Sequence, residues 1–191
     1  MLFGKRVHLL ALLAALGTTA AASIACSGGT VIDQPQKQVE VVSQSGASVK
    51  AAISSASLGE SYSGSNLQLA FVATTASNAA KITIKSVALV DMNKGTQVAL
   101  LSSSEPRVWN GSSYVTWNES VTPGGDLRAS YKLSTPNWSE IDGTGTGTGA
   151  VGRSSSSSYS IPFRLRVTMQ IDGTEVILES SELHREPVAV T

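Results

Sequence analysis

The sequence predicts an all-β fold, an immunoglobulin-like β-sandwich of about seven to nine antiparallel strands. Apolar residues alternate with polar ones along several segments, which is typical of strands that bury one face. Turn-forming residues interrupt the chain roughly every ten positions. Beyond residue 25, no long segment shows the 3.6-residue period of an amphipathic helix. A jelly roll gives the same signals with a different strand order and is the alternative.

The clearest expected strand pair lies near the C-terminal end. Apolar side chains occupy every second position from Phe163 to Ile171, so this segment has one core face and one solvent face. Asp172-Gly173 follows, and this dipeptide accepts the positive φ angles of a two-residue hairpin turn. The sequence TEVILES then returns as the partner strand.

Four further strands are expected at residues 38–42, 67–74, 81–92 and 96–101. The last two are joined by Asn-Lys-Gly at 93–95, a suitable hairpin loop because Asn and Gly accept the left-handed conformation. Within the third, the apolar parity changes between Ile84 and Val87. This change indicates a β-bulge or a switch between sheets.

Two more structural expectations concern the rest of the chain. The segments YVTWNES and DLRASYKLS flank Pro123-Gly124-Gly125 and predict a third hairpin, and a closing strand is expected near 188–190. Residues 142–158 consist almost entirely of Gly, Thr and Ser, which cannot form a packed core. They are expected to form a mobile loop, interpreted as a tolerated insertion because it holds no aromatic residue and a single basic one.

The first residues have the layout of a secretory signal peptide. Lys5 and Arg6 precede an uncharged segment, residues 7–25, which ends in small side chains. A membrane-spanning helix is the alternative, but the strongly apolar part covers only residues 7–16, which is too short for about 30 Å of hydrocarbon. Cleavage of this segment is therefore expected.

Ser23-Ile24-Ala25-Cys26 resembles the lipobox of bacterial lipoproteins. Ala25 and Cys26 match its two most demanding positions, whereas Ser23 replaces the favoured leucine and Ile24 is bulkier than usual. The resemblance implies cleavage between Ala25 and Cys26 and attachment of a diacylglyceryl group to the Cys26 sulfur. Two or more acyl chains would anchor the protein stably in a membrane. The alternative is an incidental cysteine beside an ordinary cleavage site.

The same resemblance implies a location in the bacterial cell envelope. In some of these bacteria an aspartate after the lipidated cysteine favours the inner membrane, and Ser27 stands there, so the outer membrane is expected. The polar residues that follow are expected to form a flexible tether. The expected organisation is a signal peptide at 1–25, the lipidated cysteine and tether at 26–38, and a sandwich domain at 39–191.

Charge and cysteine content exclude several classes of function. Lys+Arg and Asp+Glu both number 14, and loss of Lys5 and Arg6 with the signal leaves a net charge of −2. The charges are scattered, so no basic patch suggests a nucleic-acid partner. Cys26 is the single cysteine, so no disulfide is expected and the domain must be stabilised by its core.

No catalytic, metal or cofactor site is expected. His184 is the one histidine after the signal that could act as a catalytic base. The sequence contains no Gly-x-Ser-x-Gly motif that would position a nucleophilic serine. Glu140, Asp142 and Asp126 lie in loop-like sequence but lack the spacing of an EF-hand. The Gly-Thr repeat at 143–149 lacks the Lys-Ser/Thr ending of a phosphate-binding loop. The protein is therefore expected not to be an enzyme.

Three tryptophans remain as candidate ligand-contact residues. Trp117 alternates with Val115 and is assigned to the core. Trp109 and Trp138 adjoin turn-like sequence, where packing beneath a loop is favoured over exposure to a ligand. The expected function is a lipid-anchored, non-enzymatic envelope protein with a structural or protein-interaction role. The alternative is a carbohydrate-binding surface lipoprotein that uses Trp109 and Trp138.

Overall fold

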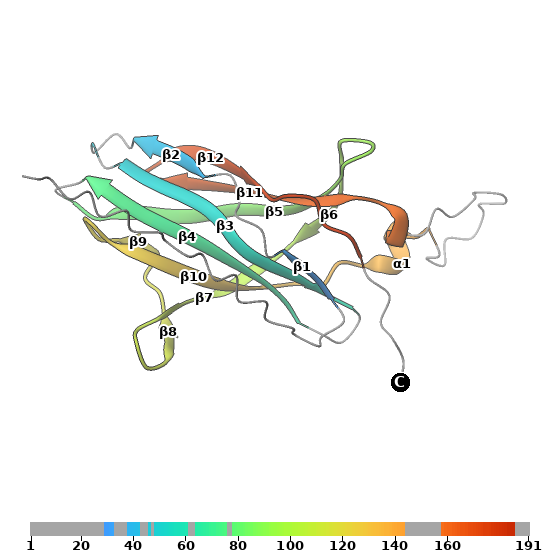
Figure 1. The fold of residues 1–191 in the computed structure, drawn as a ribbon, viewed down its shortest axis with the longest axis horizontal. Coiled ribbons are helices and arrows are strands. Elements are labelled where there is room, and N and C mark those ends of the chain that lie inside the picture. Colours follow the sequence, from blue (N-terminus) through green and yellow to red (C-terminus); the bar gives the residue numbers. More distant parts are fainter. Residues whose placement is uncertain are drawn as a thin grey trace, which may run out of the picture.

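The computed structural model describes residues 29–32, 38–42, 46, 48–60, 64–75, 78–143 and 158–185. Within these residues two antiparallel sheets pack face to face as a β-sandwich that is not closed into a barrel (Figure 1). The all-β prediction is confirmed. This part of the chain holds twelve strands, more than expected, because several are only two to four residues long.

The larger sheet contains seven strands. They are β1 (Gly29–Ile32), β2 (Val39–Val42), β3 (Ser48–Gly59), β4 (Ser65–Thr75), β7 (Ser103–Trp109), β8 (Tyr114–Thr116) and β10 (Asp126–Leu133). Their order is β1–β3–β4–β10–β7–β8. β1 pairs with the C-terminal end of β3, and β2 pairs with its N-terminal end. The smaller sheet contains five strands. They are β5 (Ala80–Asp91), β6 (Thr96–Leu101), β9 (Ser120–Val121), β11 (Phe163–Ile171) and β12 (Thr174–Glu179).

The smaller sheet has the order β12–β11–β5–β6, with β9 paired to β5. The short helix α1 (Trp138–Ile141) and the 3₁₀ turn η1 (Ser158–Ser160) lie at one end of the sandwich, which we call the α1 end (Figure 1). β3 ends there and β11 begins there. No helix in the described part of the chain has the length and hydropathy needed to cross a membrane.

The core fills the space between the two sheets. The inward side chains of β11 are all at most 1% exposed, and they meet the inward face of β3, β4 and β10. The predicted hairpin is confirmed, because β11 pairs with β12 through Asp172 and Gly173, whose φ angles are 48° and 82°. The predicted strands at 38–42, 67–74, 81–92 and 96–101 correspond to β2, β4, β5 and β6.

The change of parity in β5 is a β-bulge. The β11 partners Thr168 and Met169 face Ser86 and Ile84, so Lys85 is the extra residue. β5 pairs with β11 on both sides of this point, which decides between the bulge and the sheet switch. The 93–95 loop is also as predicted: the Asp91 side chain accepts hydrogen bonds from the backbone of Asn93 and Lys94.

The third predicted hairpin is wrong. Pro123-Gly124-Gly125 does form a turn, closed by the Gly125 amide donating to the Thr122 carbonyl at 2.8 Å. However, β9 before the turn pairs with β5 in the smaller sheet, whereas β10 after it pairs with β4 and β7 in the larger sheet. The turn therefore carries the chain between sheets, because turn residues set a local reversal and not the partner strand.

The structure also contains strands that the sequence did not predict. β3 and β7 are rich in Ser and Ala or carry charges on one side, so their alternation is weak. β1 lies inside the expected tether, where Gly29–Ile32 pairs antiparallel with residues 56–59. The expected signal peptide, Ala25, Cys26, most of the 142–158 loop and the 188–190 strand lie outside the described residues.

Candidate functional site

Two of the three tryptophans belong to the core. Trp117 packs 5.6 Å from the Phe71 ring and its indole N–H donates to the Ser120 carbonyl, as its core assignment predicts. Trp138 is 6% exposed, packs against Phe163 and donates to the Gly59 carbonyl at 3.0 Å. The packing interpretation therefore holds for Trp138, and its buried ring offers no face to a glycan.

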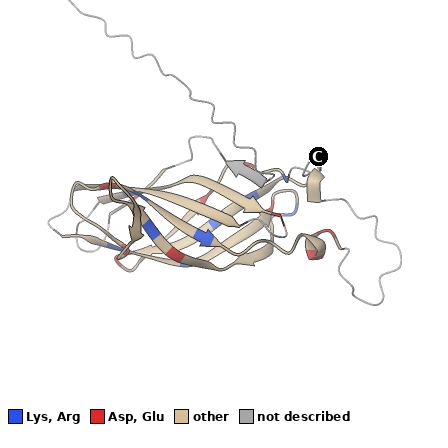
Figure 2. Ribbon diagram, turned by 90° about the horizontal axis from the view of Figure 1, so that it is seen from below, with Lys and Arg blue, Asp and Glu red and all other residues tan. Residues whose placement is uncertain are grey.

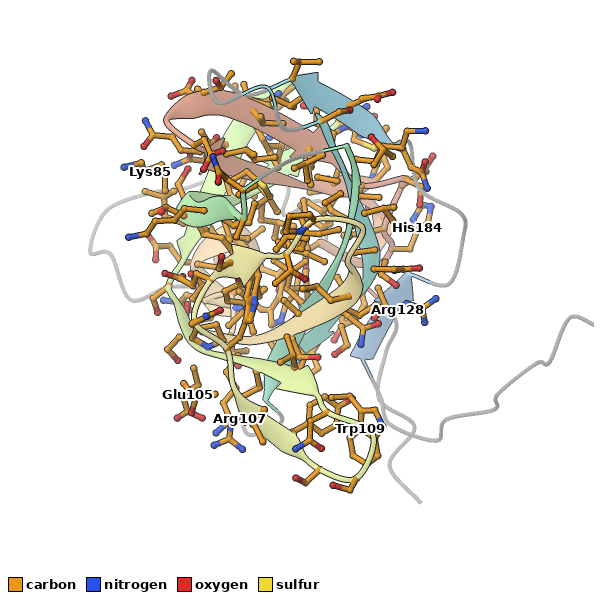
Figure 3. The ribbon with its side chains drawn as sticks, turned by 90° about the vertical axis from the view of Figure 1, so that its left-hand side faces the viewer. Lys85, Glu105, Arg107, Trp109, Arg128 and His184 are labelled. Atoms are coloured by element: carbon orange, nitrogen blue, oxygen red, sulfur yellow. The ribbon has the colours of Figure 1, made fainter. Side chains whose placement is uncertain are left out.

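Trp109 differs from both. It ends β7, is 56% exposed and contacts Tyr114 edge to face at 5.3 Å across the β7–β8 hairpin. Tyr114 is itself 52% exposed. The packing that the sequence favoured for Trp109 is wrong, because the hairpin lies at the edge of the larger sheet and its outward side chains protrude from the molecule (Figure 3).

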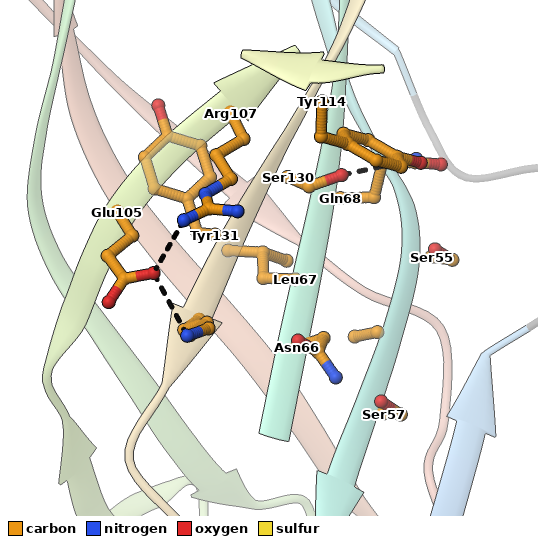
Figure 4. A pocket seen from close by; sticks show the side chains of 12 residues that line it. Ser55, Ser57, Asn66, Leu67, Gln68, Glu105, Arg107, Tyr114, Ser130 and Tyr131 are labelled. Atoms are coloured by element: carbon orange, nitrogen blue, oxygen red, sulfur yellow. Dashed lines mark hydrogen bonds and ion pairs between the residues drawn. The ribbon is translucent and has the colours of Figure 1, made fainter. Parts of the chain in front are cut away.

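A groove of about 520 Å³ lies next to this aromatic pair on the outer face of the larger sheet. Its volume is within the usual range of ligand sites, about 300–1,000 Å³. The floor comes from β3, β4 and β10 and one wall from β7 and β8 (Figure 4). The polar side chains that shape it are Ser57, Asn66, Gln68, Glu105, Arg107 and Lys132.

Strand register brings these side chains together. Gln68 of β4 faces Ser55 of β3 on one side and Ser130 of β10 on the other. One step nearer the α1 end, Asn66 faces Ser57 and Lys132 in the same way. The short serine side chains leave space above the sheet, whereas longer side chains surround that space, and this difference in length creates the groove. Side chains alternate between the two faces of each strand, so this outward set supplies the polar groups of the groove, while the mostly buried Ala56, Leu67 and Tyr131 also line it.

A backbone irregularity places the one carboxylate of the groove. The pairing of β7 with β10 shifts register at Glu105, whose φ of 54° lies in the left-handed region that non-glycine residues rarely adopt. The Glu105 carboxylate lies 2.9 Å from Lys132 Nζ and 3.5 Å from Arg107 Nη2 (Figure 4). The hydrogen bond and charge of Lys132 hold the pKa of Glu105 below its ordinary value, so it stays ionised.

A second polar cluster, at the α1 end, is structural. The Arg185 side chain is 8% exposed and donates to both Glu60 oxygens, at 2.7 and 2.8 Å. It also donates to Asp142 at 2.9 Å and to the Ser158 hydroxyl. Its guanidinium carbon lies over the rings of Trp138 and Tyr159, 4.6 and 4.2 Å from their centres. We call this set the Arg185 cluster.

The Arg185 cluster closes the base of the low-complexity loop. Asp142 and Ser158 flank the loop, and the Ser158 amide donates to the Asp142 carboxylate at 2.6 Å. Partial burial opposes ionisation of Asp142, but the hydrogen bonds from Ser158 and Arg185 outweigh it and lower the pKa. Since the guanidinium makes four hydrogen bonds within the protein, out of five N–H donors, the cluster holds the loop base together.

The remaining candidates from the sequence are placed apart from the groove. His184 is exposed and pairs with Glu182 at 2.8 Å. Glu140 accepts from the Asn137 side chain at the start of α1, and Asp126 is exposed at the start of β10. Within the described residues, no three His, Cys, Asp or Glu side chains gather closely enough to hold a metal ion.

No family model matches the chain, and no curated protein matches it by sequence. Charges elsewhere on the sandwich are scattered, with both Lys or Arg and Asp or Glu on the strands and loops (Figure 2). The groove differs from this background because polar, charged and aromatic side chains meet in one hollow.

Sequence reasoning missed most of this site. Asn66, Gln68 and Ser130 occupy the outward positions of strands whose inward positions were easy to recognise. An available signal was the run SSAS in β3, where outward serines replace the long polar side chains usual on a wet face. Which strands lie side by side decides that these residues meet, and that order is not visible in the sequence.

Proposed function

We propose that this protein is a lipid-anchored component of the bacterial cell envelope whose β-sandwich binds another envelope component without catalysing a reaction. The observation that carries the binding role is the groove on the outer face of β3, β4, β10 and β7. The lipid anchor rests on the lipobox resemblance at Cys26, and the outer membrane on Ser27 after it.

The position of β1 supports a short connection between lipid and domain. Cys26 precedes Gly29 by three residues, a span of at most roughly 11 Å. Gly29 pairs with Gly59 at the α1 end. On this proposal the α1 end faces the bilayer and the groove opens on a flank of the sandwich, where a component beside the membrane can reach it.

The charges of the groove support recognition over proton transfer. General acid–base catalysis uses a group whose pKa lies near the working pH and which has access to a reacting proton. Glu105 has a lowered pKa and already accepts from Lys132, so it is a stable anion with a fixed partner. Such a carboxylate orients a ligand through hydrogen bonds.

The anchor is tested with Cys26→Ala in the native host. Wild-type protein is expected to incorporate labelled fatty acid and to sediment with membranes, because its sulfur carries the lipid. Cys26→Ala should incorporate no label and should either keep residues 1–25 or appear in the soluble fraction, as judged by mass spectrometry and fractionation.

Ser27→Ala is the matched control, since it changes the neighbouring residue and leaves the sulfur. Retention of both fatty-acid label and membrane association in Cys26→Ala would refute the anchor. Ser27→Asp tests the location separately. The wild type is expected in outer-membrane fractions and Ser27→Asp in inner-membrane fractions. Wild-type protein found in the inner membrane would refute the outer-membrane proposal.

A further inference from the structure

We propose that the groove binds an oligosaccharide, with Tyr114 stacking on a sugar ring and the polar floor hydrogen-bonding its hydroxyl groups. This inference rests on the proposed function, since it takes the same groove as the binding site and names its ligand. The sequence suggested Trp109 and Trp138 as sugar-contacting residues. Because Trp138 is buried, the site now proposed consists of Tyr114, next to Trp109, and the polar floor of the larger sheet.

The floor matches the chemistry of sugar hydroxyls, each of which both donates and accepts hydrogen bonds. Gln68 and Asn66 each carry an amide that does both, and the floor serines add hydroxyls. Among the described residues the Gln68 side chain makes two long hydrogen bonds: it accepts from the Ser54 hydroxyl at 3.3 Å and donates to the Ser130 hydroxyl at 3.5 Å. Such weak hydrogen bonds can be exchanged for ligand contacts at small cost.

The charged end of the groove adds stronger and directional hydrogen bonds. Glu105 is an acceptor held in place between two donors, Arg107 and Lys132. Glu105 offsets one of the two positive charges, so the set has a net charge of +1 and can bind neutral hydroxyl groups as well as a weakly acidic ligand. Charge-assisted hydrogen bonds of this kind also fix the orientation of a ligand.

The aromatic end supplies an apolar surface. Tyr114 lies at the rim beside Gln68 and Ser130 (Figure 4), and Trp109 contacts its ring edge to face. Both rings are about half exposed, which leaves a flat surface for the C–H face of a sugar. Amphipathic aromatic side chains suit a sugar, because its C–H face is apolar and its hydroxyl groups are polar.

Other occupants fit the groove less well. A peptide that adds a strand needs a free sheet edge, but the groove lies on the face of strands already paired to each other. Nucleic acid needs many cations along its backbone, and Arg107 and Lys132 face Glu105. From β3 across β4 and β10 to β7, the groove spans four adjacent strands, about 14 Å at about 4.8 Å per strand spacing. This width favours several linked sugars over a single one.

The experiment titrates the purified mature lipoprotein, in detergent micelles, with neutral and uronic-acid-containing oligosaccharides from bacterial envelope polymers. Calorimetry measures binding, and tryptophan fluorescence reports on the groove because Trp109 is exposed while Trp117 and Trp138 are buried. At least one oligosaccharide is expected to bind saturably and shift the emission. Trp109→Phe should lose the fluorescence change while calorimetry still detects binding.

Gln68→Ala and Tyr114→Ala are expected to weaken Kd at least tenfold. Arg128→Ala and Ile177→Ala are matched controls, since Arg128 lies on the same face outside the groove and Ile177 is exposed on β12. Both should bind as wild type does. Thermal unfolding shows whether each variant remains folded, and Tyr114→Phe, which keeps the ring, should retain binding if Tyr114→Ala does not fold.

Lys132→Gln separates the two sugar classes: a loss confined to acidic oligosaccharides assigns Lys132 to a carboxylate, and equal loss for both assigns it to hydroxyl groups. Absence of binding across both classes, or groove variants that bind as tightly as wild type, would overturn the inference. Fatty-acid labelling of the same preparation distinguishes this failure from failure of the proposed anchor, since a labelled protein without sugar affinity refutes only the inference.

Discussion

At the scale of single residues, Arg185 links three segments that lie far apart in the sequence. Glu60 follows β3, Asp142 follows α1, and Ser158 begins η1. The bidentate contact with Glu60 uses the planar guanidinium in a way that an ammonium group cannot reproduce, and the guanidinium also lies over two aromatic rings. A substitution here therefore removes several contacts at once.

Arg185→Met is expected to lower the free energy of unfolding by about 2–4 kcal/mol, because it leaves two partly buried carboxylates without their cation. Arg185→Lys should recover only part of this loss. Urea unfolding followed by tryptophan fluorescence measures both, with the exposed Arg128→Ala as a control within about 0.5 kcal/mol of wild type. Equal stability of Arg185→Met and wild type would contradict a structural role for the cluster.

The same cluster predicts an acid dependence. Folding lowers the pKa of Asp142 from its ordinary 3.8, so its contribution to stability is fully present above that value and is lost as the pH falls through the folded pKa. Arg185→Met should weaken this dependence, because the hydrogen bond and charge of Arg185 help lower the pKa. Unfolding free energies measured between pH 2.5 and 5 test it, with each variant compared with its own value at about pH 6.

Tyr131 offers a prediction of the opposite sign. Its hydroxyl is buried without a hydrogen-bond partner among the described residues, and burial raises its pKa. Tyr131→Phe removes this polar atom and keeps the ring packed against Trp117. An increase in unfolding free energy of about 1 kcal/mol is expected from chemical denaturation. A decrease would indicate that the hydroxyl has a stabilising partner.

At the scale of elements, the β11–β12 hairpin depends on a turn that requires positive φ. Gly173 has a φ of 82°, and a Cβ added there would meet no atom within 4 Å. Gly173→Ala therefore carries only a backbone cost, expected at about 1–2 kcal/mol. Gly64→Ala is the matched control, since Gly64 also has open space but no positive φ. Unfolding midpoints of the pair should differ, and equal midpoints would contradict the strain argument.

Sequence predicts those elements whose cause is local. The β11–β12 hairpin and the 93–95 loop each follow from alternation or turn chemistry within a few residues, and the parity change in β5 narrowed that region to a bulge or a sheet switch, which the pairing with β11 decides. The third hairpin failed because the partner of β9 lies in the other sheet, which no local signal encodes. The groove was missed for the same reason. Its residues are spread over five strands, and only strand order and register bring them together.

At the scale of the whole molecule, the proposed anchor sets the orientation of the sandwich relative to the membrane. β1 begins beside Gly59, so a lipid on Cys26 would hold the α1 end close to the bilayer. β3 has 12 residues, a length of about 40 Å at about 3.3 Å per residue. The opposite end, which carries the 172–173 turn, would therefore stand well away from the membrane surface.

Single fluorophores test this orientation, because lipidation of Cys26 leaves an engineered cysteine as the one free thiol in the chain. Lys94→Cys places the probe in the loop near the α1 end, and Glu175→Cys places it near the opposite end, on exposed positions in both cases. Nitroxide-labelled lipid headgroups should quench the first probe strongly and the second weakly, since they differ in height by most of the length of the sandwich. Equal quenching would mean that the residues between Cys26 and the domain let it lie in any direction, and that β1 does not set the orientation.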